Sequence, residues 1–368
     1  SDLRRRATAR TARILVDWTV TDGGFAMLFA LLSCSEYDLG NTKDDPHDRP
    51  PLDSNGQVVD TSSTTDTLPG TDSGTVTDPG TDTDTDTTPV ETPPSGKMDV
   101  MLLIDVAYFY DCYHADLPVN TDALVAALLT SGADVNVGIA TYDDYQVEGE
   151  WFAAWGGLPY KLEQQLTNDR SRLQTASSGL ELEWGGDGPG TGLESIVQVM
   201  SGLGYDQDCD GNFDSDTDIR PFDARAGDVF GGSVSGSEVT STPGTGTENG
   251  VGWRTGATKI VVVFAENALR DREEGHEIPS GTCTAVGTRS AAIDKLQEGE
   301  AKFLGINAYE FQDKDDTLER QLEDLARSTS SRIDSDADGA QDDTAVLSGS
   351  WDWPATAVIV SAIWDLAD

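Results

Sequence analysis

The sequence has few of the residues that zinc sites and the best-known hydrolase motifs require. Among its 368 residues there are three histidines and four cysteines, and no two cysteines form a Cys-x-x-Cys pair. This spacing does not predict a structural zinc site. The sequence also lacks a His-Glu-x-x-His motif, a phosphate-binding loop and a Gly-x-Ser-x-Gly elbow. It therefore carries no motif of the common metalloprotease, nucleotide-hydrolase or serine-hydrolase classes.

Basic residues are also scarce. The chain has 24 lysines and arginines against 66 aspartates and glutamates, and its formal net charge is −42. Such a charge repels phosphate backbones and anionic lipids, so we expect no nucleic-acid partner and no membrane contact except through a lipid anchor. Hydrophobic residues make up only 37% of the chain. The folded part is therefore expected to be shorter than the chain and to amount to about one domain.

Residues 1–34 resemble an export signal. Several arginines near the start precede the apolar run Phe25–Leu32, which has the length of a signal-peptide core rather than of a membrane span. Leu31-Leu32-Ser33-Cys34 resembles a bacterial lipobox. This resemblance implies that Cys34 is lipidated and that the exported protein is anchored to a bacterial membrane, at the outer membrane or the cell surface. The alternative is a fortuitous apolar patch.

Residues 35–96 are rich in Thr, Asp and Pro, as in the run Thr81-Asp82-Thr83-Asp84-Thr85-Asp86. Because the segment has almost no large apolar side chain to bury, it cannot offset the entropy lost on ordering. Repulsion among the aspartates and the scattered prolines favour extended conformations. We predict a disordered linker that holds a domain away from a membrane.

The folded domain is predicted to span residues 97–368, with a flexible insertion near 209–252. Val100–Ile104 and Lys259–Phe264 contain uninterrupted apolar runs, which predict strands buried on both faces of a parallel sheet. Further strands are expected at 134–141, 160–166, 302–308 and 346–347. Helices are expected at 121–130, where Thr121-Asp122 can form the N-terminal cap, from about residue 168, and at 192–200, 290–297, 317–326 and 354–366. This alternation predicts an α/β fold, with a doubly wound, mostly parallel central sheet flanked by helices.

Asp105 follows the first predicted strand directly. In an open parallel sheet, ligands bind at the edge where the strands end, because loops and helix N-termini meet there. Asp105 is therefore a candidate ligand-binding residue. A helix cap or a turn residue is the alternative role.

The segment Lys97–Asp111 resembles the first strand and metal loop of von Willebrand factor type A domains, in their integrin beta-subunit variant. That family carries Asp-x-Ser-x-Ser at this point, whereas Ala107 and Phe109 stand at the serine positions here. Asp187–Ile196 is similar to the family's Asp-x-Pro-Glu-Gly-Gly-x-Asp-Ala-Ile segment, and Gly252-Trp253-Arg254 is similar to the entry into its fourth strand. The resemblance implies the same fold and a function in binding or adhesion.

The resemblance also implies an adhesion-type Mg²⁺ site, formed by Asp105, Thr191 and Glu266. The motif is degenerate, because both serines are replaced and Gly190 stands where the family has a glutamate. The remaining oxygen groups either hold a cation weakly or mark a site that has decayed. We expect no enzyme, although Asp105 and Glu266 would be the carboxylate pair of one.

Two acidic loops share the spacing Asp-x-Asp-x-Asp-Gly-x-x-Asp: the first acidic loop, Asp206–Asp214, and the second acidic loop, Asp334–Asp342. Alternate carboxylates can surround one Ca²⁺, and the glycine permits the tight turn. Both loops resemble the calcium loops of thrombospondin type 3 repeats and dockerins; the alternative is acidic surface loops without an ion. The expected Ca²⁺ ligands are Asp206, Asp208, Asp210, Asn212 and Asp214 in the first loop, and Asp334, Asp336, Asp338, Ala340 and Asp342 in the second.

The integrin-beta resemblance further implies a disulfide between Cys209 and Cys283, which bracket the Gly-Trp-Arg segment. An exported protein permits this oxidation, and two free thiols are the alternative. Taken together, the sequence predicts a calcium-stabilised cell-surface binding or adhesion protein whose ligand is a protein or another envelope component. A structural envelope lipoprotein with a non-functional Mg²⁺ site is the alternative function.

Overall fold

The computed structural model describes residues 93–107, 117–145, 158–181, 189–207, 209–213, 218–223, 227–228, 250–276, 278, 287–308, 316–336, 338–348 and 355–368, together with 20–21 and 24–25. The chain divides into two units, Ser1–Asp82 and Thr83–Asp368. In the first unit, β1 (Val20–Thr21) pairs antiparallel with β2 (Gly24–Phe25). Cys34 and nearly all of the predicted linker lie outside the described residues.

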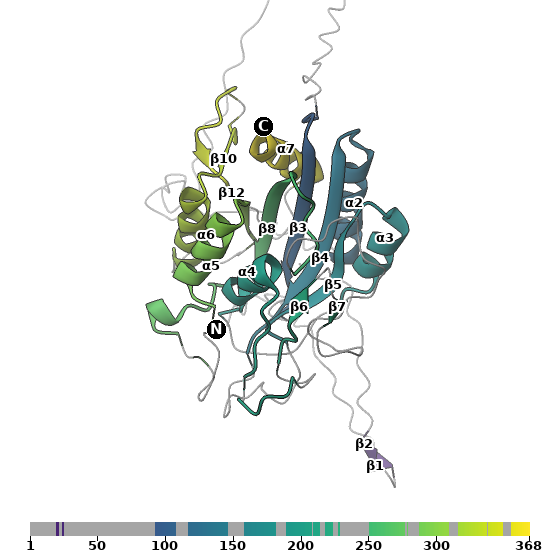
Figure 1. Cartoon of the computed structure of the whole chain (residues 1–368), viewed down its shortest axis with the longest axis vertical. Helices are drawn as coiled ribbons and strands as arrows, with labels where there is room; N and C mark the ends of the chain where they lie inside the picture. Colours follow the sequence, from purple (N-terminus) through teal and green to yellow (C-terminus); the bar gives the residue numbers. More distant parts are fainter. Residues whose placement is uncertain are drawn as a thin grey trace, which may run out of the picture. The chain divides into compact units, whose positions relative to one another are not determined.

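A six-stranded sheet forms the centre of the second unit, with the strand order β12-β9-β8-β3-β4-β5 (Figure 1). Neighbouring strands are parallel, except that β5 runs antiparallel to β4. This arrangement confirms the predicted α/β fold with a mostly parallel sheet. The strands are β3 (Lys97–Asp105), β4 (Asp134–Tyr142), β5 (Lys161–Thr167), β8 (Thr258–Ala265), β9 (Lys302–Asn307) and β12 (Val346–Ser348).

Helices cover both faces of the sheet. One group consists of α2, which packs against α3 and α7; the other consists of α5, which packs against α4 and α6. In Figure 1, α4 crosses in front of the sheet and α2 lies behind it. The helices are α2 (Leu117–Thr130), α3 (Arg170–Ser178), α4 (Gly192–Ser201), α5 (Arg289–Glu298), α6 (Thr317–Ser328) and α7 (Thr356–Ala367).

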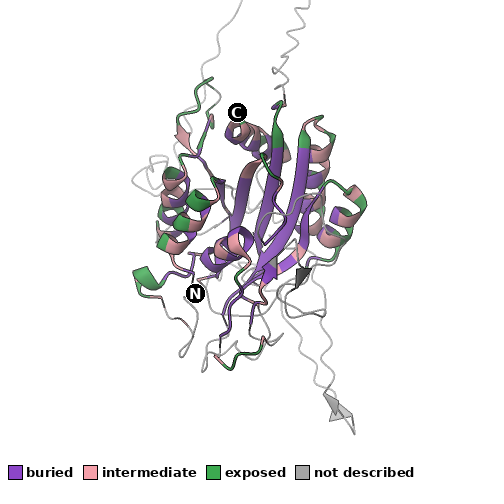
Figure 2. Cartoon of the chain, viewed as in Figure 1, coloured by how far each residue is buried: buried purple, intermediate pink, exposed green. Residues whose placement is uncertain are grey.

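Strand β3 lies in the middle of the core. Every residue from Met98 to Asp105 is buried, and β4 and β8 flank the strand on either side (Figure 2). Leu102 is in register with Ile139 on one neighbour and Val262 on the other. A continuous apolar run is therefore required here, because both faces of β3 are covered by helices.

One helix start differs from the prediction. Thr121 was expected to cap a helix, but α2 begins at Leu117, and Thr121 is a fully buried residue within it. Leu117 is itself buried in the core, and Pro118 occupies the first turn, where a missing backbone N–H costs nothing. Burial of Leu117 thus extends the helix beyond the local capping signal.

Shorter elements complete the second unit. The strands β10 (Arg332–Ile333) and β11 (Asp343–Thr344) pair antiparallel on either side of the second acidic loop. β6 (Phe222–Asp223) pairs with β7 (Gly227–Asp228), and the 3₁₀ turn η1 (Arg272–Glu274) follows β8. Within the part of the chain that the structure describes, no helix has the length and apolarity needed to cross a membrane.

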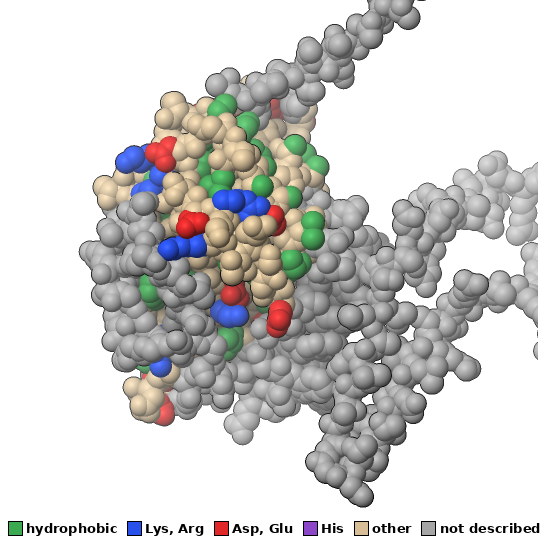
Figure 3. Space-filling view, turned by 90° about the vertical axis from the view of Figure 1, so that its right-hand side faces the viewer, with side chains coloured by type: hydrophobic (Ala, Val, Ile, Leu, Met, Phe, Trp, Pro, Cys, Tyr) green, Lys and Arg blue, Asp and Glu red, His purple; other side chains and the backbone are tan. Residues whose placement is uncertain are grey.

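The right-hand side of the molecule carries charges of both signs. Figure 3 shows basic and acidic side chains close together on this side, among scattered apolar ones. Helix α3, which lies on the right in Figure 1, forms two ion pairs: Arg170 with Asp122 at 2.6 Å and Arg172 with Asp169 at 3.2 Å. Interspersed charges of this kind are typical of a solvated surface.

Candidate functional site

The carboxyl edge of the sheet is the edge at which β3, β4 and β8 end. Asp105 is the last residue of β3 and only 1% exposed. Its Oδ1 accepts the backbone N–H of Ala107 at 3.1 Å, and its Oδ2 accepts that of Glu266 at 3.3 Å. Burial and the nearby carboxylate of Glu266 raise the pKa of Asp105 well above its ordinary value.

Thr191 lies at the same edge, immediately before α4. Its Oγ1 is within hydrogen-bond reach of two backbone carbonyls, that of Pro159 at 2.7 Å and that of Asp143 at 3.2 Å. The preceding Gly190 packs closely: a Cβ there would be 3.6 Å from Asp105 Oδ2 and 3.3 Å from the carbonyl oxygen of Asp143. The turn that carries Thr191 therefore covers Asp105.

Two further charged residues at this edge were missed in the sequence. Asp144 follows β4 and Arg270 follows β8; each is only 2% exposed, and their side chains form an ion pair at 2.5 Å. The Arg270 Nε also donates to the carbonyl of Pro189 at 3.0 Å. The acidic pair Asp143-Asp144 follows the second predicted strand, so the sequence could have indicated a charged residue at this edge. Nothing near Asp144 in the sequence indicates that its partner is Arg270.

The residues at the carboxyl edge do not fit the Mg²⁺ site that the family resemblance implies. Octahedral Mg²⁺ needs six oxygen ligands and retains several waters, whereas Asp105 is only 1% exposed and its Oδ2 already accepts the backbone N–H of Glu266. Within the described residues, Asp105 and Glu266 belong to no group of three acidic side chains with oxygens close enough to share an ion. The three predicted ligands meet at one edge without forming a coordination shell.

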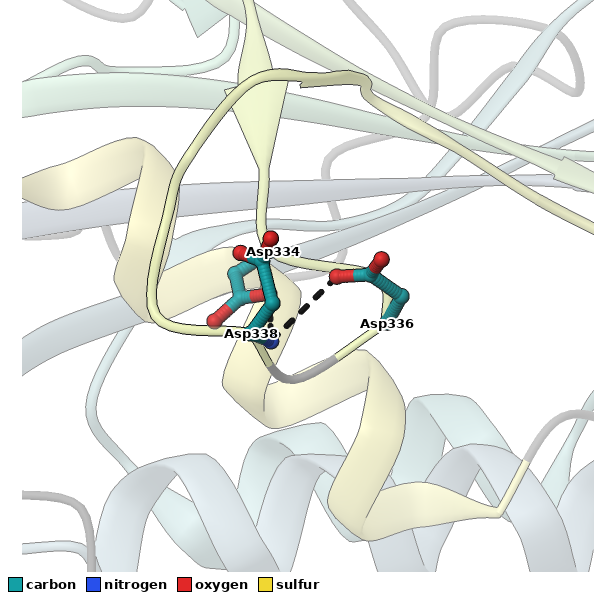
Figure 4. A group of neighbouring side chains, drawn as sticks. All are labelled: Asp334, Asp336 and Asp338. Atoms are coloured by element: carbon teal, nitrogen blue, oxygen red, sulfur yellow. Dashed lines mark hydrogen bonds between the residues drawn. The ribbon is translucent and has the colours of Figure 1, made fainter.

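The second acidic loop does bring its carboxylates together. One carboxylate oxygen from each of Asp334, Asp336 and Asp338 lies within 4.8 Å of the other two. Figure 4 shows the three side chains close together in the loop. Asp334 is half-buried, whereas Asp336 and Asp338 are exposed. Ala340 and Asp342, the other two predicted ligands, are exposed in the same loop. Hard carboxylate oxygens at this spacing match the ligand set that Ca²⁺ prefers.

Hydrogen bonds explain how this loop turns. The carboxylate of Asp334 accepts the backbone N–H groups of Asp338 at 3.0 Å and of Gly339 at 2.8 Å. Asp338 Oδ1 accepts the N–H of Ala340 at 2.8 Å. Gly339 has a φ of 90°, a left-handed conformation that glycine adopts without a steric penalty.

The first acidic loop has the same internal pattern. The carboxylate of Asp206 accepts the N–H groups of Cys209 at 2.8 Å and of Gly211 at 3.1 Å. Asp210 Oδ1 accepts the N–H of Asn212 at 2.6 Å, and Gly211 has a φ of 81°. In both loops, therefore, the first aspartate binds the glycine N–H and the fifth residue binds the N–H of the seventh. Two of the predicted ligands, Asp208 and Asp214, lie outside the described residues.

The two loops differ in their electrostatics. Both hydrogen bonds from Asn212, by its side chain and by its backbone, lower the pKa of Asp210. In the second loop, the backbone N–H of Asp338 lowers the pKa of Asp336, but the neighbouring carboxylates and the partial loss of solvent together raise this pKa above its ordinary value. The second loop is thus the one in which clustered negative charges repel one another most clearly.

The second loop is also bound to the C-terminal helix. Asp365 of α7 accepts the backbone N–H of Asp334 at 2.9 Å and the side-chain amide of Gln341 at 3.2 Å. Asp343, the residue after the loop, accepts the hydroxyl of Ser335 at 2.5 Å. Asp365 was missed because 31 residues separate it from Asp334, and no motif in the sequence connects them.

Cys209 is disulfide-bonded and has a φ of 67°, an uncommon conformation for a residue with a Cβ. Its predicted partner, Cys283, lies outside the described residues. The pairing of Cys209 with Cys283 therefore stays a prediction.

No protein-family model matches this sequence, and no curated protein matches it. The resemblance to von Willebrand factor type A domains therefore stays a prediction from the motifs in the sequence. The acidic loops and the carboxyl edge must be interpreted from their own chemistry.

Proposed function

We propose that this protein is an exported, lipid-anchored binding or adhesion protein of the bacterial cell surface, whose α/β domain is stabilised by Ca²⁺. The observation that carries the proposal is the hydrogen-bond pattern shared by the first and second acidic loops. Two loops far apart in the chain share these turn-forming hydrogen bonds, and in the second loop one carboxylate oxygen from each of three alternate aspartates lies within 4.8 Å of the other two. The integrin-beta resemblance supports the binding role.

The expected effect of Ca²⁺ follows from charge. Without a cation, Asp334, Asp336 and Asp338 hold carboxylate oxygens within 4.8 Å of one another, and this repulsion destabilises the folded loop. An ion that binds the folded state alone stabilises it, by about 2.7 kcal/mol when its concentration is a hundred times the dissociation constant.

The full-length protein tests this directly. We expect millimolar Ca²⁺ to raise its melting temperature by roughly 5–10 °C relative to EGTA, measured by calorimetry. Asp336→Asn removes one exposed ligand and should reduce the rise, whereas Glu319→Gln, which removes an exposed charge on α6, should preserve it. An identical melt of the wild-type protein in Ca²⁺ and in EGTA would show that the loops are acidic surface loops without an ion.

The lipid anchor has its own test. Cells that express the full chain should incorporate a palmitate analogue into it, and Cys34→Ala should abolish the label. No label in the wild-type chain, or equal label in both, rules out the anchor.

A structural envelope lipoprotein is the second candidate, and the burial of Asp105 and of the Arg270–Asp144 ion pair at the carboxyl edge favours it. The two functions differ in what loss of the protein changes. Deletion should reduce the attachment of cells to surfaces or to other cells if the protein is an adhesin. If it is structural, deletion should increase sensitivity to detergent and leave attachment unchanged.

A further inference from the structure

We infer that Arg270 supplies the positive charge at the carboxyl edge, in the role that the family resemblance assigns to a divalent cation, and that this edge binds no Mg²⁺ or Mn²⁺. The inference concerns Asp105, Asp144, Glu266 and Arg270, and it is independent of the acidic loops. It makes the described segments of this edge depend on an internal ion pair rather than on a metal.

The position of Arg270 is the first argument. Its side chain is 2% exposed and binds Asp144, which is equally buried, while its Nε donates to the carbonyl of Pro189. A guanidinium remains charged throughout the accessible pH range and requires no ion from solution. One internal cation thus joins the end of β4, the segment after β8 and the turn before α4.

The backbone around Arg270 strengthens the closure. The Arg270 N–H donates to the carbonyl of Gly190 at 2.7 Å, and the Gly190 N–H donates to the carbonyl of Ala268 at 3.0 Å. Gly190 and Leu269 consequently form a parallel bridge. The Arg270–Pro189 hydrogen bond and this bridge hold the same two segments together, and the ion pair with Asp144 joins them to the end of β4.

The space beside Asp105 is the second argument. Gly190 is close enough that even a single added carbon would contact both Asp105 Oδ2 and the backbone of Asp143. The same oxygen already accepts the N–H of Glu266. A Mg²⁺ ion with its bound waters would have to displace this turn, which the Arg270 contacts hold in place.

The composition of the edge is the third argument. The adhesion-type motif needs hydroxyl groups at positions 107 and 109, and the sequence has Ala107 and Phe109. Ala107 instead uses its backbone N–H to satisfy Asp105 Oδ1 at 3.1 Å. The carboxylate is therefore bound by backbone donors from two directions, as expected for a structural rather than a metal-ligating aspartate.

Counting bound Mn²⁺ tests the inference. The full-length protein and Asp105→Asn, which keeps the size of the side chain, are titrated with Mn²⁺ and the free ion is followed by electron paramagnetic resonance. We expect the same number of bound ions in both, whether the acidic loops bind two, one or none. Loss of one ion in Asp105→Asn would overturn the inference, whereas failure of the calcium proposal would appear as no bound ion in either protein.

Replacing the arginine tests its role as the internal cation. Arg270→Met leaves Asp144 buried without its guanidinium and should lower the melting temperature by roughly 10 °C. Arg270→Lys keeps the charge but not the forked geometry, so it should lower the melting temperature less. Asp144→Asn, added to Arg270→Met, should restore part of the lost melting temperature. A wild-type melting temperature in Arg270→Met, or a loss that Asp144→Asn does not reduce, would contradict the role.

Discussion

Strand β3 carries a buried aspartate near each of its ends, and different groups bind the two carboxylates. Asp99, near the start, is 0% exposed and accepts two bonds of 2.6 Å from Arg254, one from its Nε and one from its backbone N–H. Asp105, at the other end, is 1% exposed and is bound by the backbone N–H groups of Ala107 and Glu266. The guanidinium of Arg254 therefore binds Asp99 directly, whereas the donors to Asp105 are backbone N–H groups alone.

The pKa values express this difference. Burial raises the pKa of both aspartates, but at Asp99 the hydrogen bonds and charge of Arg254 oppose the rise. At Asp105 the nearby Glu266 adds to it. Equal burial of the same residue type on one strand therefore says little about its charge, which depends on what the tertiary structure places beside it.

Among the substitutions near β3, removal of Arg254 should destabilise the protein most. Arg254 also binds Asp134 and the carbonyl of Met98. Arg254→Met therefore leaves the fully buried Asp99 with the backbone N–H of residue 254 but without its guanidinium. We expect the free energy of unfolding to fall by about 3–5 kcal/mol, measured by urea denaturation of the full-length protein at pH 7.

Arg254→Lys is the matched variant. It retains the charge but cannot reproduce the forked contacts. Its free energy of unfolding should therefore lie between those of the wild-type protein and Arg254→Met. A loss below about 1 kcal/mol in Arg254→Met would mean that Asp99 does not depend on the guanidinium.

The pH dependence of stability should separate the two aspartates. Because the folded-state pKa of Asp105 lies above its unfolded-state value, its contribution to stability is complete below the unfolded value and is lost as the pH rises through the folded value. Asp105→Asn should therefore flatten the decline in unfolding free energy as the pH rises above about 4. At low pH, Asp105→Asn should itself lower the free energy of unfolding by about 1 kcal/mol, because the amide nitrogen of asparagine cannot accept one of the two backbone N–H groups.

Asp99→Asn serves as the comparison in the same titration. Arg254 opposes the rise in the pKa of Asp99, so we expect its substitution to change the slope less. Glu194, whose pKa burial also raises, is retained in both variants and contributes equally. Identical slopes in the wild-type protein and in Asp105→Asn would mean that Asp105 does not titrate as proposed.

Asp134→Asn should have the smallest effect. Asp134 pairs with Arg254 at 2.5 Å, but its side chain is 54% exposed, and exposed ion pairs contribute about 0.2–1 kcal/mol. Urea denaturation should show a loss in that range, far below that of Arg254→Met. A loss comparable to that of Arg254→Met would place the stabilising charge at the exposed aspartate instead of at Asp99.

Several elements could be predicted because their signal is local. The apolar run after Lys97 became β3 with Asp105 at its end, and the run after Lys259 became β8. The start of α2 was wrong because burial of Leu117 outweighed the capping signal at Thr121. Tertiary packing thus shifted an element boundary without changing the order of the elements.

The parts of the candidate sites also differ in whether their signal is local in the sequence. The second acidic loop was predictable because Asp334, Asp336 and Asp338 are near neighbours in the chain, and a turn with glycine at one position is enough to bring them together. The contact of Asp365 with this loop was not, since it depends on how α7 packs against the domain.

The sequence alone determined the alternation of buried strands and helices and the two acidic turns, because chain geometry over a few residues sets both periodicity and local hydrogen bonding. Only the tertiary structure decided which charges meet. Arg254 reaches Asp99 across 155 positions and Arg270 reaches Asp144 across 126. These pairs form because parallel strands bring their ends together, and the order of strands in the sheet is a property of the whole fold.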